Sequence, residues 1–315
     1  MVDLKKLRMD ALEVYLTLCQ TGSFSNTARL LRRSQGGVSQ VLKVLEQQVF
    51  GCRLVNRSSR EFSLTSEGVL VRGFAESTLR LLKDTMRQID NLRDEASGTI
   101  KISTSTTPGE VIVPRLISQF KEDFPRVEFD VMFNNTRRSI ELVGGMDVDF
   151  AFVGSTKDLP PSVEHLTLAQ DRLVVIADHD HPLFKGGAPK SWNQILKYPF
   201  ILREDGSATR EEFLDFLADL GERRPNMVLD LNDNHAIINA LEGSPFLTVV
   251  SSWVAELVIK SGRAREVSLP GGVEIQRPLS VVWRPDSLDA RVNRQFLEFV
   301  RKWLNGGELR GGGHP

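Results

Sequence analysis

Hydrophobic residues recur at different intervals in three parts of the chain. Before about residue 65 they form short stretches of helical spacing separated by polar turns, and from about 65 to 93 they form one long stretch without proline. From Ile100 onward, short runs in which apolar and polar residues alternate are separated by further helical stretches. Alternation is typical of strands, whereas intervals of three and four residues are typical of helices. The pattern therefore predicts a small helical unit, one long helix and an α/β body.

Two short helices joined by a turn are predicted within residues 21–68. Ser25 is expected to cap the first helix, because its hydroxyl can accept a hydrogen bond from a backbone N–H that the first turn leaves free. Ser34 is expected to cap the second helix in the same way. The apolar side of the first helix consists of Ala28 and Leu31, and that of the second consists of Val38, Val41, Leu42 and Leu45.

The outward face of the second helix carries side chains that suit contact with DNA. Glutamine, serine and lysine can read base edges in a major groove or hold phosphates. A solvated amphipathic helix would show the same pattern, so both interpretations remain open on this helix alone. The residues predicted to bind DNA from this region are Ser34, Gln35, Gly36, Ser39, Gln40 and Lys43.

A basic hairpin is predicted after the two helices. Phe62 and Leu64 alternate with polar residues as in a short strand, and Arg57 and Arg60 stand just before them. Such a hairpin after a helix-turn-helix is a wing, whose arginines can reach phosphates or a narrow minor groove. Arg57 and Arg60 are therefore added to the predicted DNA-binding residues.

An ordered set of residues runs through this segment and the helix before it. It consists of Leu12, Tyr15, Gly22, Ser23, Phe24, Ser34, Gln35, Ser39, Leu45, Glu46, Arg57, Arg60, Leu64, Thr65 and Gly68. In this pattern the chain resembles the DNA-binding domain of the LysR-type transcriptional regulators. The resemblance implies a winged helix-turn-helix that binds double-stranded promoter DNA.

The segment departs from that family at two places. Gly36-Gly37 stand where Pro-Ala is usual, and Gln40 stands where an arginine is common. Two glycines in a fully helical first turn cost about 1 kcal/mol each relative to alanine, and they remove apolar surface that could touch a thymine methyl. The departures therefore bear on which DNA sequence is preferred.

The charge of the chain is unevenly divided. Residues 1–65 hold ten lysine and arginine and five aspartate and glutamate residues, so their formal charge is +5, which leaves −6 for the rest of a chain whose total is −1. A basic amino-terminal unit on an acidic body suits a protein that meets DNA at one end. Hydrophobic content of 41% and charged content of 26% are ordinary for a globular protein.

The cysteines and the amino-terminal residues indicate in which cellular compartment the protein is expected. Cys19 falls on the inner side of its helix, and Cys52 could be partly exposed just before the wing, which leaves a redox role for it open. Two cysteines give neither a disulfide framework nor a metal cluster. No stretch resembles a signal peptide or approaches ~20 uninterrupted apolar residues, so we expect a cytoplasmic protein that does not enter a membrane.

Residues 66–96 are predicted to form a linker helix that pairs with a second copy of the chain. Its apolar stripe consists of Val71, Ala75, Leu82, Met86, Ile89 and Leu92. The helix could instead lie on its own core, but palindromic operators require a two-fold dimer, and in the resembling family this helix is the dimerisation element. Leu82, Met86 and Ile89 are therefore assigned to the contact within a homodimer or homotetramer, which is also expected to contact RNA polymerase.

The body is predicted to consist of two α/β lobes. Alternation of strands and helices implies parallel sheet with right-handed crossovers, and the order resembles the effector domain of the same family, which is like a periplasmic binding protein. Predicted strands lie near 100–102, 127–133, 150–153, 173–176, 200–202, 228–229, 247–250 and 279–283, and predicted helices lie near 109–123, 137–142, from 209, 235–241 and 289–304. The predicted boundaries are 1–65 for the winged helix-turn-helix, 66–96 for the linker helix, 97–168 plus 270–305 for lobe I, 169–269 for lobe II and 306–315 for a disordered tail.

Three polar loops of the body, at 103–109, 134–136 and 203–210, suit a ligand. Ligands in such lobes bind beyond the carboxyl ends of parallel strands, where helix N-termini offer free N–H groups. By the resemblance, these loops face each other across the inter-lobe cleft, and their chemistry favours a small anionic or polyhydroxylated metabolite. The same residues are also good helix caps, and Arg203 could pair with neighbouring carboxylates. The predicted effector-binding residues are Ser105, Thr106, Thr107, Asn135, Thr136, Arg203, Ser207, Thr209 and Asn234.

Other classes of function find less support in the sequence. A solute-binding protein would not need the amino-terminal unit, and an α/β enzyme would need a catalytic constellation. No two of the five histidines have helical metal-ligand spacing, and no glycine motif matches a dinucleotide or phosphate fingerprint. We therefore expect neither enzymatic activity nor a metal or cofactor, only a small-molecule effector.

Overall fold

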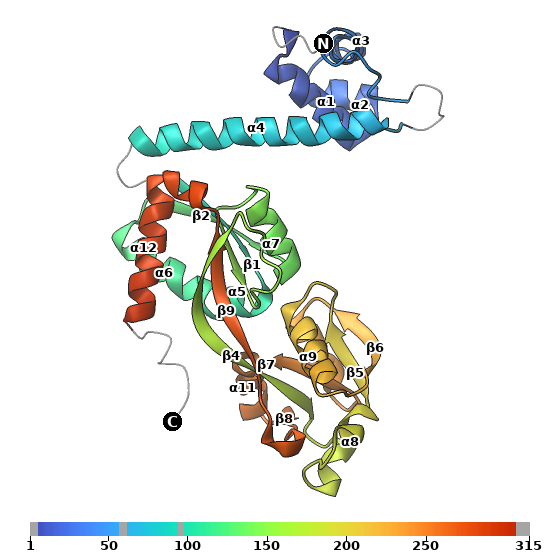
Figure 1. Cartoon of the computed structure of the whole chain (residues 1–315), viewed down its shortest axis with the longest axis vertical. Coiled ribbons are helices and arrows are strands. Elements are labelled where there is room, and N and C mark those ends of the chain that lie inside the picture. The colour runs from blue at the N-terminus through green and yellow to red at the C-terminus, as the bar shows by residue number, and fades with distance from the viewer. Residues whose placement is uncertain (1–5, 57–61, 94–97, 307–315) are drawn as a thin grey trace. The chain divides into compact units, whose positions relative to one another are not determined.

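The computed structural model of the chain describes residues 6–56, 62–93 and 98–306 (Figure 1). Two compact units divide the chain, Met1–Ile89 and Asp90–Pro315. The predicted wing arginines Arg57 and Arg60, and residues 307–315 of the predicted tail, lie outside the described residues.

The first unit contains the two predicted short helices and one helix before them. Buried apolar side chains from all three helices and from the chain after them form its core, among them Leu12, Leu18, Val38 and Leu54. An antiparallel bridge between Val55 and Leu64 is the base of the predicted wing. The helices are α1 (Met9–Thr21), α2 (Phe24–Leu30), α3 (Gln35–Val44) and a π-helical turn (Leu45–Val49).

The cap of α2 differs from the prediction. Ser23, not Ser25, occupies the N-cap position, and its hydroxyl accepts a hydrogen bond from the backbone N of Asn26 at 3.4 Å. Gly22 ends α1 in the left-handed conformation, with φ of 60°, so the chain has already turned when it reaches Ser23. Ser25 therefore lies inside α2, where its hydroxyl donates to Gln35 Oε1 at 3.3 Å.

The predicted long helix is present as α4 (Ser66–Arg93). Val71, in its second turn, is buried against the core of the first unit. A Cβ on Gly68 would lie only 2.0 Å from Leu54 O, and Tyr15 donates a hydrogen bond to Gly68 O at 2.8 Å. Glycine at position 68, one of the residues that carry the family resemblance, is therefore required by this close backbone approach.

The second unit is built on one mixed sheet of nine strands in the order β2-β1-β3-β9-β4-β7-β5-β6, with β8 paired to β4. The parallel arrangement expected in the first lobe is confirmed, because β1 pairs in parallel with both β2 and β3. This lobe contains the strands β1 (Gly98–Thr104), β2 (Val127–Phe133) and β3 (Phe150–Val153) and the helices α5 (Thr106–Val111), α6 (Val113–Asp123), α7 (Thr136–Gly144) and α12 (Arg291–Asn305).

The second lobe is also organised around a parallel centre, since β5 pairs in parallel with β6 and β7. It contains the strands β5 (Pro199–Arg203), β6 (Asn226–Leu231), β7 (Leu247–Ser251) and β8 (Ala264–Glu266) and the helices α8 (Trp192–Leu196), α9 (Ala208–Asp219), α10 (Asn234–Leu241) and α11 (Ser252–Lys260). Short 3₁₀ turns lie at Pro182–Gly186, Pro270–Gly272 and Pro285–Asp289.

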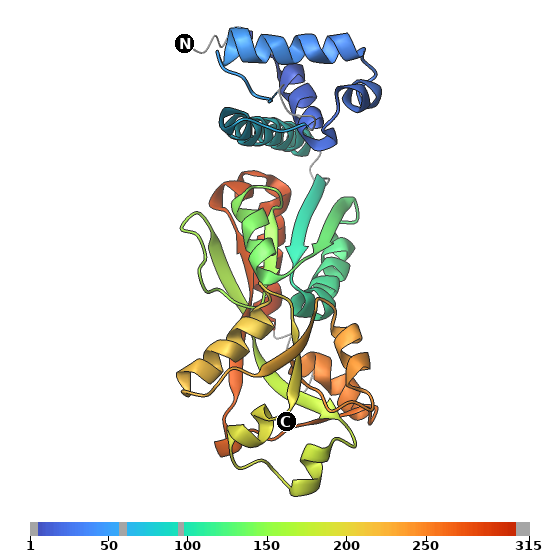
Figure 2. The same ribbon diagram turned by 90° about the vertical axis from the view of Figure 1, so that its right-hand side faces the viewer.

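Two long antiparallel strands, β4 (Glu164–Asp178) and β9 (Ile275–Trp283), join the lobes. Leu279 lies in the core of the first lobe, whereas Ile275 lies in the core of the second. The chain therefore leaves the second lobe within β9, later than the boundary predicted at residue 270. Figures 1 and 2 show the lobes placed one after the other along this strand pair.

Several elements differ from the sequence pattern. The single helix predicted at 109–123 is interrupted at Ile112, because α6 restarts with Pro114 in its first turn, and proline has no N–H for a continuous helix. The helices α8 and α11 and the strand β8 were not predicted. Within the described residues, no helix is both long enough and apolar enough to cross a membrane.

Candidate DNA interface and inter-lobe site

The outward face of α3 is polar and exposed, as the sequence predicted. Val38 and Leu42 are buried beneath it, whereas Gln35, Ser39, Gln40 and Lys43 are exposed. The Ser34 hydroxyl accepts a hydrogen bond from Gly37 N at 3.0 Å, which confirms the predicted cap of this helix. No atom outside the immediate chain lies within 4 Å of a Cβ built on Gly36, so the first turn of α3 is open on that side.

The base of the wing is fixed by a buried carboxylate. Glu46, in the π-helical turn, accepts hydrogen bonds from Leu54 N at 2.9 Å and from Val55 N at 3.5 Å. Asn56 N donates to Ser63 O at 2.9 Å on the other side of the bridge. The residues before the wing are thus bonded to the π-helical turn that follows α3, and the residues after the wing are bonded to them across the bridge.

Helix α4 exposes large apolar side chains. Leu82 is 39% exposed and Met86 is 59% exposed, whereas the side chain of Ile89 lies outside the described part of the chain. A second set of exposed apolar residues, Leu70, Phe74 and Leu81, recurs at intervals of four and seven residues and was not predicted. Both sets are available for contact with a partner helix.

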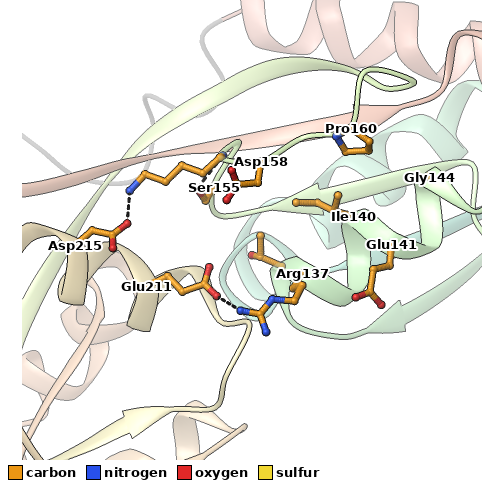
Figure 3. Close-up of a pocket in the computed structure, with 11 residues that line it drawn as sticks. Arg137, Ile140, Glu141, Gly144, Ser155, Asp158, Pro160, Glu211 and Asp215 are labelled. Atoms are coloured by element: carbon orange, nitrogen blue, oxygen red, sulfur yellow. Dashed lines mark hydrogen bonds and ion pairs between the residues drawn. The ribbon is translucent and has the colours of Figure 1, made fainter.

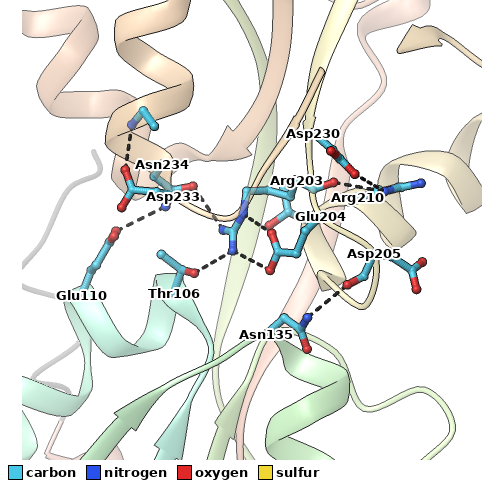
Figure 4. A network of polar contacts seen from close by, with 12 residues as sticks. Thr106, Glu110, Asn135, Arg203, Glu204, Asp205, Arg210, Asp230, Asp233 and Asn234 are labelled. Carbon is cyan, nitrogen blue, oxygen red and sulfur yellow. Dashed lines mark hydrogen bonds and ion pairs between the residues drawn. The ribbon is translucent and has the colours of Figure 1, made fainter. Parts of the chain in front are cut away.

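The three predicted loops converge between the lobes. They line a small cavity of about 10 Å³, to which all predicted effector-binding residues except Asn234 contribute. Asn234 does not line the cavity, but it contacts Arg203, which does. Its Oδ1 accepts a hydrogen bond from Arg203 Nη1 at 3.3 Å (Figure 4). The lining residues are Ser105, Thr106, Thr107, Asn135, Thr136, Arg203, Ser207, Ala208, Thr209 and Arg277.

Arg203 connects the two lobes at this cavity. Its side chain is 4% exposed, and its Nη2 donates to Thr106 Oγ1, across the lobes, at 2.9 Å. Its Nε donates to the Glu204 carboxylate at 2.9 Å, so the predicted alternative of a local ion pair is present together with the cross-lobe bond. Beyond Asn234, burial raises the pKa of Glu110, to which the Asn234 amide donates a long hydrogen bond of 3.4 Å.

Arg277 is a second buried arginine at the cavity, and it was not among the residues predicted from the sequence. Its Nε donates to Asp171 at 2.8 Å, its Nη1 donates to Thr209 at 2.8 Å and its Nη2 donates to Thr107 at 3.0 Å. Arg277 lies on β9, and its partners come from β4 and from both lobes. A Cβ on Gly154 would lie 2.8 Å from Arg277 Nη1, so glycine there leaves room for the guanidinium.

The polar side chains that line the cavity differ in the hydrogen bonds that they already make. The Asn135 amide caps α7, and Thr136 Oγ1 accepts from Gly154 N at 3.3 Å. Ser105 and Ser207 stand at the N-cap positions of α5 and α9, yet neither hydroxyl makes a capping bond. The interpretation of these two serines as simple caps is therefore not supported by their geometry.

Ion pairs between the lobes flank the cavity on one side. Arg137, on α7, bonds the carboxylates of Asp205 and Glu211, and Lys157 bonds Glu212 at 2.8 Å and Asp215 at 2.9 Å. The hydrogen bond from Arg137 lowers the pKa of Asp205. These pairs border an open hollow of about 520 Å³ (Figure 3).

A second open hollow of about 560 Å³ lies beyond Arg203, between Glu110, Phe133, Arg138 and Asp233.

Within the described ranges, no cluster of three or more histidine, cysteine or acidic side chains is arranged to hold a metal ion. Cys19 and Cys52 are free and half-buried, and burial raises the pKa of both thiols.

A helix-turn-helix with an exposed polar helix, followed by a long helix and a two-lobed α/β body, defines a class of DNA-binding regulators. The family model for a bacterial regulatory helix-turn-helix protein of the lysR family matches residues 9–69, and the model for the LysR substrate binding domain matches residues 93–305. The chain belongs to the LysR family of transcriptional regulators.

Known relatives cover nearly the whole chain. An HTH-type transcriptional regulator of Methanocaldococcus jannaschii is 31% identical over 92% of this chain and 97% of its own length. The HTH-type transcriptional activator CmpR of Synechocystis is 26% identical over 94% of this chain and 96% of its own. Full-length CbnR in complex with its target DNA is similar in fold, with a TM-score of 0.72 at 17% identity over 94% of this chain and 99% of that chain.

Proposed function

We propose that this regulator binds promoter DNA as a dimer or tetramer and that a small polar or anionic metabolite, bound between the two lobes, modulates its binding or activation. The observation that carries the proposal is the cavity between the lobes. Side chains from loops nearly 100 residues apart, such as Thr106 and Arg203, meet there and bond each other directly. A ligand that replaces such bonds contacts both lobes at once.

Contact with both lobes provides the coupling that regulation requires. A ligand shifts a conformational equilibrium only by its different affinity for the two states. A ligand held by Thr136 of the first lobe and Ser207 of the second binds better when the lobes are close, so it stabilises that arrangement. Each hydrogen bond from such a hydroxyl is worth ~0.5–1.5 kcal/mol, or ~1.5–3 kcal/mol if the ligand is charged.

The first unit supplies the contact with DNA in this proposal. Gln35, Ser39, Gln40 and Lys43 are exposed on one helix, and glutamine can bond adenine with both atoms of its amide. The exposed apolar residues of α4 supply the pairing surface, because two copies of the helix would cover side chains that one copy leaves in water.

The test uses the full-length protein and a fluorescent fragment of a promoter that it protects. Promoter affinity is measured by anisotropy while fractions of small metabolites are added, and the active compound is then purified. For this compound, Thr136→Ala is expected to move the midpoint of the response to a threefold to hundredfold higher concentration. Ser162→Ala, an exposed hydroxyl outside the cavity, serves as the control. A wild-type midpoint in Thr136→Ala, Thr106→Ala and Ser207→Ala together would rule out this cavity as the effector site.

A further inference from the structure

Two serine hydroxyls in the inter-lobe cavity have no hydrogen-bond partner among the residues that the structure describes. Ser105 is 7% exposed and Ser207 is 4% exposed, and both line the cavity. None of the hydrogen bonds found in the described part of the chain involves either hydroxyl, although both serines stand at N-cap positions. Both serines are more than nine-tenths buried, but their hydroxyl oxygens are not among the fully buried polar atoms without a partner, so they remain accessible from the cavity. These two groups are therefore poised to bond something that enters the cavity.

The N–H donors of Arg277 lie at the same cavity. Its Nε is occupied by Asp171, which also accepts a hydrogen bond from the Ser251 hydroxyl at 2.7 Å. Among the described residues, its two terminal nitrogens donate to the neutral hydroxyls of Thr107 and Thr209. An anionic oxygen is a stronger acceptor for a guanidinium than a hydroxyl is, especially when two oxygens are bonded side by side. An anion can therefore replace these threonines as the partner of Arg277.

Helix ends and local charges agree with a ligand of low negative charge. The helices α7 and α9, of nine and twelve residues, begin at the cavity and direct their positive ends toward it. Asp171 and Glu204 already balance Arg277 and Arg203. The helix ends thus add positive potential to a site whose two buried arginines already have acidic partners, and they favour a ligand with few charges.

The size of the cavity limits the ligand. About 10 Å³ is roughly the space for one water-sized group. Arg203, which bonds Thr106, and Arg277 both line this space. A small separation of the lobes admits a group of a few atoms, whereas an aromatic ring or a sugar phosphate would have to break the ion pairs of Arg137 and Lys157 as well.

We infer that the inter-lobe cavity takes a compact anion, either an inorganic oxyanion or a short carboxylate, and that Arg277 is the residue that recognises its charge. Ser105 and Ser207 donate to the anion, and the Arg277 guanidinium exchanges Thr107 and Thr209 for anionic oxygens. Arg277 lies on β9 and bonds Asp171 on β4, and these two strands join the lobes. The exchange of its partners on anion binding therefore changes contacts with both lobes. This inference rests on the proposed function and narrows the class of its ligand.

The test measures thermal unfolding of the full chain with sodium sulfate, phosphate, acetate or oxalate. Ionic strength is kept constant with sodium gluconate, a bulky anion, and benzoate and glycerol serve as an aromatic anion and a neutral compound. We expect at least one compact anion to raise the unfolding temperature of the wild type and of Arg284→Met, an arginine outside the cavity paired with Asp286. In Arg277→Met the apparent Kd for that anion is expected to rise at least tenfold.

Ser207→Ala and Ser207→Thr make the test independent of whether Arg277→Met folds. Ala removes the unpartnered hydroxyl and is expected to raise the Kd threefold to tenfold, whereas Thr keeps a hydroxyl and is expected to restore binding. The inference is overturned if no compact anion binds, if benzoate or glycerol binds equally well, or if the Kd is unchanged in Ser207→Ala or in folded Arg277→Met. If a larger metabolite then still alters promoter binding through Thr136, the proposed function stands and only the class of ligand is wrong.

Discussion

Replacing Asp171 by Asn leaves the guanidinium of Arg277 buried without its countercharge. The side chains are 0% and 2% exposed, and the bond between Arg277 Nε and the Asp171 carboxylate is 2.8 Å long. Loss of one partner of a buried ion pair costs about 3–5 kcal/mol. Asparagine keeps the shape and one acceptor oxygen, so we expect the free energy of unfolding of the body to fall by about 3 kcal/mol, at the lower end of that range.

Urea unfolding followed by tryptophan fluorescence measures this change. All four tryptophans lie after residue 190, so the signal reports on the body and not on the DNA-binding unit. The double variant Asp171→Asn/Arg277→Met removes both charges and is expected to be more stable than Asp171→Asn alone, because the isolated buried charge is gone. A loss below about 1 kcal/mol in Asp171→Asn, or a double variant that is less stable than the single one, would refute the interpretation of this pair as mutually dependent.

Three further predictions concern the DNA-binding unit and α4. Gln35→Ala and Gln40→Ala should lose about 1–3 kcal/mol of discrimination between operator and random DNA; equal losses on both, measured by competition gel shift, would contradict base reading. Arg57→Ala and Arg60→Ala should weaken binding to all sequences and make the log–log salt slope shallower by about 1, and an unchanged slope would remove them from the phosphate contacts. Leu82→Asp should weaken the dimer, because it places a charge in an apolar contact; an intact dimer in sedimentation equilibrium would show that α4 pairs elsewhere.

The elements that the sequence predicted well are those whose pattern is local. The Ser34 cap, the long helix α4 and the strands β1, β2 and β3 follow from spacing and from residues close together in the chain. The order of strands and helices placed the polar loops beyond the carboxyl ends of parallel strands, whereas their convergence across the two lobes was implied by the family resemblance.

The parts that were missed depend on contacts between distant segments. Arg277 and Asp171 are paired by the register of β9 against β4, which no local pattern gives. The first part of β4 and the first part of β9 carry polar and charged residues, so the alternation of apolar and polar residues that is typical of strands was not evident there. The wrong prediction of Ser25 as the cap of α2 had a local cause. Gly22 adopts the left-handed conformation, so Ser23 occupies the N-cap position.

The break within the helix predicted at 109–123 also had a local signal in Pro114. Proline is favoured in the first turn of a helix and disfavoured in the interior, so its position pointed to a new start at α6. By contrast, the serines without partners at 105 and 207 have the same sequence signature as ordinary caps. Only the positions of their hydroxyls distinguish the two roles.

Control of DNA binding by the cavity between the lobes is tested by measuring the coupling between effector binding and operator binding. The Kd of the purified effector is measured by calorimetry on the full-length protein, with and without saturating operator DNA, and the operator Kd is measured with and without saturating effector. We expect both affinities to change by the same factor, because coupling between two sites is reciprocal, and we expect Thr136→Ala to weaken effector binding in both series. If neither Kd changes when the other ligand is saturating, or if Thr136→Ala leaves the effector Kd unchanged, the cavity between the lobes does not control DNA binding.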